Sequence, residues 1–121
     1  MWTHSQSTGV TTNPDEGVTG HGYAGNGDGK NNPAMQNVEG IGPLPRGRYT
    51  IGPAYDHPHL GPVTMNLTPD PANEMYGRSE FRIHGDSKAA PGTASKGCIV
   101  QNHSVRDAIN ASDDKDLEVV E

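Results

Sequence analysis

Apolar and polar residues alternate along two stretches in the second half of the chain. Residues 63–68 alternate with a period of two, which is typical of a half-buried strand. Residues 80–84 do the same, with Phe81 and Ile83 on one face. His84 therefore points to the opposite face, at the end of this predicted strand.

Shorter apolar runs predict the remaining elements. Three of them favour strands: residues 48–51, 98–101 and 117–120. Residues 104–111 are expected to form a helix that Asn102 or Ser104 caps, with apolar side chains at helical spacing. Residues 1–40 are rich in Gly, Asn, Thr and Ser and predict loops with one short strand near Trp2. We therefore expect a small, mainly antiparallel β domain, a sandwich or barrel, with one short helix near the C-terminus.

The composition bounds the size of the core. The chain has 121 residues, which fits a single domain over residues 1–121. Hydrophobic residues make up 31% of the chain, and it contains 16 Gly and 10 Pro. The apolar residues cluster in short runs instead of being diluted evenly, so we expect a folded domain with a small core and many ordered turns.

Charge and hydropathy exclude several partners. The net charge is −6 and no basic stripe is present, which argues against nucleic acid. No stretch approaches the ~18 apolar residues that span a membrane. The N-terminus lacks the pattern of a Sec signal, so we expect synthesis in the cytoplasm without that export route. Residues 78–98 contain four bases and two acids, a local balance that suits a carboxylate-bearing substrate.

Cys98 is the single cysteine, so no intrachain disulfide forms. A lone thiol is more often a small buried hydrophobe than a nucleophile. The segment before it, Ser95-Lys96-Gly97, favours a nucleophile over a buried hydrophobe, because its residues are small and flexible and Lys96 favours the thiolate. The N–H groups of Gly97 and Cys98 are candidate donors to a developing oxyanion. We therefore predict a nucleophile at Cys98.

A thiol with an ordinary pKa needs a partner that takes its proton. His84 is the best candidate for this base, because it ends a predicted strand and precedes Gly85. Asp86, Ser87 or a backbone carbonyl near them is expected to hold the second ring nitrogen. The site is thus predicted to comprise Cys98 and His84, shaped by the residues around each.

The other histidines and the turn-rich segment give weaker signals. Three histidines lie in polar surroundings: His4, His21 and His103. His57 and His59 have a spacing that a zinc site can use, but no third ligand lies nearby. Residues 25–33 have some features of a calcium loop, yet Lys30 occupies a ligand position and no glutamate closes the loop. We predict no metal and no cofactor.

The order of these motifs resembles a known enzyme family. His84 followed by Ser95-Lys96-Gly97-Cys98 is similar to the His … Ser-x-Gly-Cys signature of YkuD-type L,D-transpeptidases. Residues 42–51 resemble the Pro-x-Gly-x-aromatic-x-Ile strand upstream in that fold. Two positions depart from the pattern, because Lys96 replaces the usual His and Val100 replaces the usual Arg. These departures favour a divergent branch over a housekeeping cross-linking enzyme.

Three further segments narrow the resemblance, which spans residues 2–102. Trp2 with residues 5–9, residues 22–25 and residues 30–33 are similar to the bacterial family DUF2778, which includes the Tlde1 group of type VI secretion L,D-transpeptidase effectors. The resemblance implies an L,D-transpeptidase-like β fold. It also implies a substrate-binding pocket that includes four residues: Tyr23, Asn32, Arg78 and Lys96.

The implied chemistry is an attack by Cys98 on the peptide bond between meso-diaminopimelate and the terminal D-Ala of a tetrapeptide stem. D-Ala leaves with a proton from His84, and water or a free D-amino acid resolves the thioester. The result is L,D-carboxypeptidase activity or D-amino acid exchange on peptidoglycan. Either reaction removes stems that are needed for cross-linking, so a delivered enzyme is expected to be an antibacterial toxin.

Such an effector implies further partners and leaves alternatives open. A secretion-system carrier, a cognate immunity protein and action in the periplasm of the target cell are all expected from the resemblance. One alternative is a housekeeping L,D-transpeptidase that forms 3–3 cross-links. Another is a non-catalytic cell-wall-binding module that retains the fold. A sortase-like enzyme is disfavoured, because no Thr-x-Thr-Cys context is present and Arg106 lies in the predicted helix.

Overall fold

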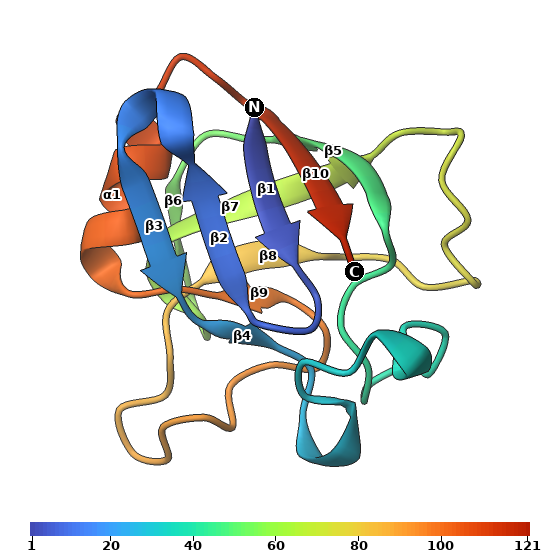
Figure 1. Ribbon diagram of the computed structural model, residues 1–121. Helices are drawn as coiled ribbons and strands as arrows, with labels where there is room; N and C mark the ends of the chain where they lie inside the picture. Colours follow the sequence, from blue (N-terminus) through green and yellow to red (C-terminus); the bar gives the residue numbers. More distant parts are fainter.

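One mixed β-sheet curls almost into a barrel and contains most of the regular structure (Figure 1). The computed structural model describes residues 1–121. The strands are β1 (Trp2–Ser5), β2 (Val10–Asn13), β3 (Val18–His21), β4 (Tyr23–Ala24), β5 (Gly47–Ile51), β6 (Tyr55–His57), β7 (Gly61–Pro69), β8 (Arg82–His84), β9 (Ile99–Val100) and β10 (Asp116–Val120). The helical elements are α1 (His103–Ala111) and the single 3-10 turns η1 (Pro14–Glu16), η2 (Gly27–Gly29) and η3 (Pro33–Met35). The expected mainly β fold with one short helix near the C-terminus is confirmed.

The strand order is β3-β2-β1-β10-β5-β7-β8-β9-β4, with β6 paired to β7 outside this path. The two edge strands of the sheet, β3 and β4, follow each other in the chain and are joined by Gly22. We call the gap between these two edges the seam of the barrel. Gln101 fastens this seam, because its Nε2 donates to Gly9 O at 3.0 Å and to Thr11 Oγ1 at 2.9 Å. A Cβ at Gly22 would lie 1.7 Å from Val100 O, which leaves glycine as the residue that fits.

All strand pairs are antiparallel except β1–β10 and β8–β9. A parallel pair needs a long crossover between its strands, and residues 85–98 supply it for β8–β9. In Figure 1 this crossover is a loop that extends below the sheet. Helix α1 packs against β3 and β7. Asn102 is the cap of α1, because its Oδ1 accepts from Val105 N at 2.9 Å.

The interior of the barrel is apolar over most of its volume and polar at the seam. Fourteen buried apolar residues form one cluster, from Trp2 and Leu117 on one side to Ile83 and Ile99 on the other. Along β1 the side chains alternate, so that Trp2 and His4 both point inward. His4 and Gln101 meet Thr11 near the seam, where His4 Nδ1 and Thr11 Oγ1 are 2.8 Å apart. The small core is therefore completed by buried polar side chains.

Two expectations about the elements were wrong. Residues 1–40 contain four strands, because pairing among β1, β2 and β3, and of β1 and β4 with the distant β10 and β9, orders a Gly- and Thr-rich chain that has little local preference. Strand β8 begins at Arg82 and not at Glu80, whose φ of 65° lies in the left-handed region. His4, expected in polar surroundings, lies in the barrel interior and contacts Thr11 there.

The buried His4 predicts a loss of stability in acid. Burial lowers the pKa of His4 to about 4, whereas an unfolded histidine titrates near 6.5. The unfolded chain therefore binds a proton between these values that the native protein does not bind, and the free energy of unfolding falls as the pH drops from 6.5 toward 4. A shift of this size corresponds to about 3 kcal/mol. Urea unfolding of the wild type and of His4→Asn across this range measures the effect.

His4→Asn should be less stable at neutral pH but should show a shallower decline in acid. His21→Asn, on the exposed side of β3, is the matched control and should keep the wild-type slope. Equal slopes for the wild type and His4→Asn would contradict this account of the buried imidazole.

Candidate active site

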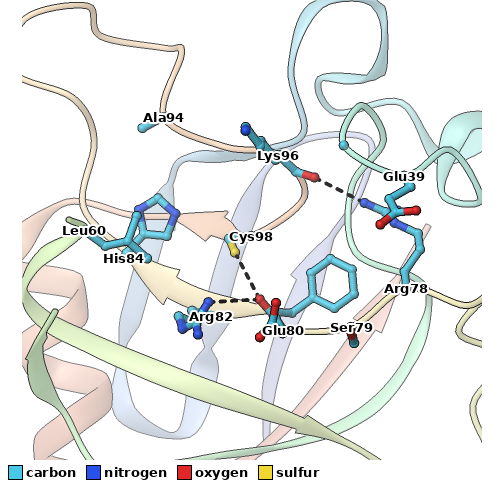
Figure 2. A pocket seen from close by; sticks show the side chains of 12 residues that line it. Glu39, Leu60, Arg78, Ser79, Glu80, Arg82, His84, Ala94, Lys96 and Cys98 are labelled. Carbon is cyan, nitrogen blue, oxygen red and sulfur yellow. Dashed lines mark hydrogen bonds between the residues drawn. The ribbon is translucent and has the colours of Figure 1, made fainter. Parts of the chain in front are cut away.

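The parallel pairing of β8 with β9 places Cys98 and His84 on one face of the sheet. Ile83 pairs with Ile99 and His84 pairs with Val100. Both isoleucines are fully buried in the core. Side chains alternate along each strand, so His84 and Cys98, which directly precedes β9, point away from that core. Their side chains line the same pocket (Figure 2).

This pocket has a volume of about 390 Å³ and is walled by four segments of the chain. Residues 78–82 form its floor, and residues 94–98 form the opposite side. Glu39 and Gly40 close one end, while Leu60, from the turn between β6 and β7, contacts the end near His84 (Figure 2). The pocket thus lies between the β8–β9 crossover, the β6–β7 hairpin and the turn segment before β5.

His84 is held in the state of a neutral base. Its Nδ1 donates to Gly85 O at 2.8 Å, which leaves the Nε2 lone pair as the proton acceptor. Burial lowers the pKa of His84, and the charges of Arg106 and Arg82 lower it further. The orienting group is therefore the Gly85 carbonyl, one of the alternatives left open between Asp86, Ser87 and a nearby backbone carbonyl.

The environment of Cys98 disfavours the thiolate. Its Sγ lies 3.9 Å from Glu80 O, the acceptor that the left-handed backbone of Glu80 turns toward the pocket (Figure 2). Burial raises the pKa of the thiol, although the Arg82 backbone N–H and the charges of Arg82 and Arg78 oppose this shift. The environment thus disfavours the charged form of both side chains, which lie on the same face of the β8–β9 pair.

The turn before Cys98 is organised by Ser95. Its Oγ donates to Cys98 O at 2.6 Å and accepts from Gly97 N at 3.0 Å and from Gly25 N at 2.8 Å. The Gly97 N–H is consequently engaged, whereas the Cys98 N–H has no acceptor within the protein. Of the two N–H groups expected to serve an oxyanion, the Cys98 N–H is the one with a free hydrogen.

Asp86 and Ser87 shape the crossover and do not contact His84. Asp86 accepts from Tyr23 Oη at 2.6 Å and from the backbone N–H of Ser87 and of Gly92. Although partial burial acts in the opposite direction, these donors hold the pKa of Asp86 below its usual value. Lys30 adds a bond to Gly92 O and lies over the Tyr23 ring, 4.3 Å from its centre. The crossover is therefore fastened to the barrel at several points.

The four residues expected to bind substrate separate into two groups. Arg78 and Lys96 line the pocket, and Lys96 is exposed there. Tyr23 is buried beneath the crossover, and Asn32 caps η3 by accepting from Ala34 N. The structure brings Cys98, His84, Arg78 and Lys96 together but leaves Tyr23 and Asn32 outside the pocket.

Sequence reasoning did not single out Glu80 or Arg82 as site residues. Arg82 is two residues before His84, so strand alternation alone places it on the same face. The left-handed turn at Glu80 carries no such signal, because the residue is not a glycine. Arg106 also lies closer to the site than its helical position suggests, since its Nη2 lies 2.7 Å from a Cβ built at Gly85.

No group of three His, Cys, Asp or Glu side chains is arranged to hold a metal ion. His57 Nδ1 accepts from the backbone N–H of His59 and of Leu60, so it stabilises the hairpin turn. Lys30 lies over Tyr23 in the segment with features of a calcium loop. None of the helices has the length and apolar character that crossing a membrane requires.

Comparison with known proteins identifies the family. Neither the curated proteins nor the solved structures gave a significant match. A family model described as the Tlde1 domain matches residues 19–120, which include both Cys98 and His84. The match confirms the resemblance inferred from the motifs of the sequence. The chain therefore belongs to the Tlde1 domain family, formerly DUF2778, and this membership implies a secreted type VI effector.

Proposed function

We propose that this protein is an antibacterial effector that acts on tetrapeptide stems of peptidoglycan as an L,D-carboxypeptidase, with D-amino acid exchange as a second outcome. One observation carries the proposal. Cys98 and His84 lie on the same face of the β8–β9 pair and line one pocket, and the Gly85 carbonyl leaves His84 Nε2 free to take a proton. A nucleophile and an oriented base are the two groups that a thioester mechanism requires.

In the first half-reaction, Cys98 Sγ transfers its proton to His84 Nε2 and bonds to the carbonyl carbon between meso-diaminopimelate and D-Ala. The carbonyl oxygen becomes an oxyanion, to which the Cys98 N–H donates. The intermediate then collapses to a thioester as the C–N bond breaks. His84 returns its proton to the departing amine of D-Ala, which restores the neutral imidazole.

In the second half-reaction, His84 accepts a proton from water or from the amine of a free D-amino acid. The activated oxygen or nitrogen attacks the thioester carbonyl, and the C–S bond breaks. His84 then protonates the departing Cys98 sulfur. Water yields a tripeptide stem, whereas a D-amino acid yields an exchanged tetrapeptide stem.

Charges around the pocket support a substrate that carries a carboxylate. Lys96, Arg82 and Arg78 line it together with Glu39 and Glu80. The two cations with solvent-accessible side chains, Lys96 and Arg82, attract the terminal carboxylate of the stem and oppose its escape before reaction. The leaving D-Ala carries this carboxylate, so the pocket suits cleavage at the end of the stem and not within the glycan strand.

Family membership supports the biological setting of the proposal. A type VI effector is made in the cytoplasm of the producer and carried by the secretion system into a competitor. We propose that this chain then acts in the periplasm of the target cell. The producer would need an immunity protein, and the pocket that contains Cys98 is the surface that such a partner would block.

Muropeptide analysis tests the proposed reaction. Peptidoglycan or purified disaccharide tetrapeptide is incubated with the wild type, Cys98→Ala, His84→Gln and the exposed control His21→Gln, and products are identified by mass spectrometry. The wild type and His21→Gln should release D-Ala and form tripeptide stems. Cys98→Ala should abolish the reaction, and His84→Gln should reduce it by about 100-fold or more, because general-base catalysis contributes on that scale.

Two outcomes of the muropeptide experiment oppose the proposal. Dimers with 3–3 cross-links as the main products would indicate a housekeeping transpeptidase. Processing that persists in Cys98→Ala would remove Cys98 from the mechanism, and binding to peptidoglycan without any processing by the wild type would indicate a wall-binding module.

The pH profile tests the protonation states of the pair. Because burial lowers the pKa of His84, the imidazole stays a neutral base to below its ordinary value of 6.5. We expect kcat/KM to fall in acid with a midpoint below pH 6.5. His84→Gln should lose this acidic limb. An acidic limb centred at or above pH 6.5 in the wild type would contradict the environment described for His84.

A further inference from the structure

Arg78 carries a buried positive charge that forms no ion pair with a carboxylate. Its side chain is 5% exposed. Nη1 donates to Gln36 O at 2.6 Å and to Pro43 O at 2.8 Å, and Nη2 donates to Gly42 O at 3.0 Å and to Lys96 O at 3.3 Å. All four acceptors are neutral carbonyls, and neither ion pair of the protein includes Arg78. Burying a charge without a counter-ion is costly, so its position calls for a physical reason.

The guanidinium lies against the peptide that leads into Cys98. A Cβ built at Gly97 would meet Arg78 Nη2 at 2.6 Å, and Lys96 O accepts from the same nitrogen (Figure 2). Its opposite side faces the segment before β5, where Leu44 N donates to Gly97 O at 3.0 Å. Arg78 thus links two loop segments, the one before β5 and the one that leads into Cys98.

We infer that Arg78 is a positioning residue for Cys98, whose planar fork fixes the turn before the nucleophile and whose unpaired charge stabilises the anionic sulfur. The four Nη hydrogens are all used by backbone carbonyls, so Arg78 does not grip a substrate carboxylate with its fork. This assignment differs from the substrate-binding role that the family resemblance implied.

Burial distinguishes Arg78 from the other cations of the pocket. Lys96 is exposed and Arg82 is half-buried, so water and salt screen their charges. The charge of Arg78 acts through protein and is screened less. The lowered pKa of Arg78 agrees with this setting, since burial is its main cause and the charges of Tyr49, Glu39 and Cys98 act in the opposite direction.

The test uses alkylation of Cys98 by iodoacetamide as a function of pH, which requires no substrate. In Arg78→Met the midpoint of the profile should rise, and each unit of rise lowers the alkylation rate near pH 8 by about tenfold. Arg78→Lys keeps the charge but loses the fork, so its midpoint should stay within about 0.3 unit of the wild type, while its melting temperature falls.

Lys115→Met is the matched control for general loosening of the fold. Lys115 is half-buried and also donates to backbone carbonyls, those of Ile109 and Asn110, yet it does not line the pocket. It should lose thermal stability and keep the wild-type alkylation midpoint. An equal rise in Lys115→Met would show that the effect comes from loosening and would overturn the inference.

Two other results would also overturn it: an unchanged midpoint in folded Arg78→Met, or a rise of about one unit or more in Arg78→Lys. If Arg78→Met does not fold, the alkylation midpoint of Arg78→Lys alone decides whether the inference stands. The part of the inference that concerns catalysis rests on the proposed function. Because alkylation is measured without peptidoglycan, a failure of the proposed reaction leaves this result readable, and the two failures are distinguishable.

Discussion

The parallel pairing of β8 with β9 is the constraint on which the site depends. The register that joins Ile83 to Ile99 buries both side chains and turns Cys98 and His84 to the other face. A slip of one residue would send the nucleophile into the core, because side chains alternate along a strand. The same pairing requires the crossover of residues 85–98, which forms one wall of the pocket. Fold and site therefore arise from one feature of the sheet.

The environment of this pair disfavours the charged form of both groups. Burial lowers the pKa of His84 and raises that of Cys98, so each shift disfavours the charged form. In the proposed mechanism, the pair becomes reactive when a carbonyl is bound next to Cys98 Sγ. The inferred role of Arg78 is to offset part of the cost of forming the sulfur anion.

The sequence predicted the strands that have strong alternation and the two residues proposed for catalysis. Phe81, Ile83 and His84 form a regular pattern, and Ser95 to Cys98 form a recognisable motif. It did not predict β1 to β4, since their order comes from strand pairing, among β1, β2 and β3 and with the distant β10 and β9, and not from local preference. Arg78 drew attention only as a substrate contact, because the four carbonyls that surround it become neighbours only in the folded chain.

The central claim is that Cys98 forms a thioester with the tetrapeptide stem and that His84 assists it. Intact-protein mass spectrometry of the wild type, quenched in acid shortly after mixing with disaccharide tetrapeptide, tests this claim most directly. The account predicts an adduct with the mass of the stem lacking D-Ala, located on the peptide that contains Cys98 and removed by hydroxylamine. Release of D-Ala without any adduct in acid-quenched samples taken over the whole course of turnover, or an adduct on a different residue, would contradict it.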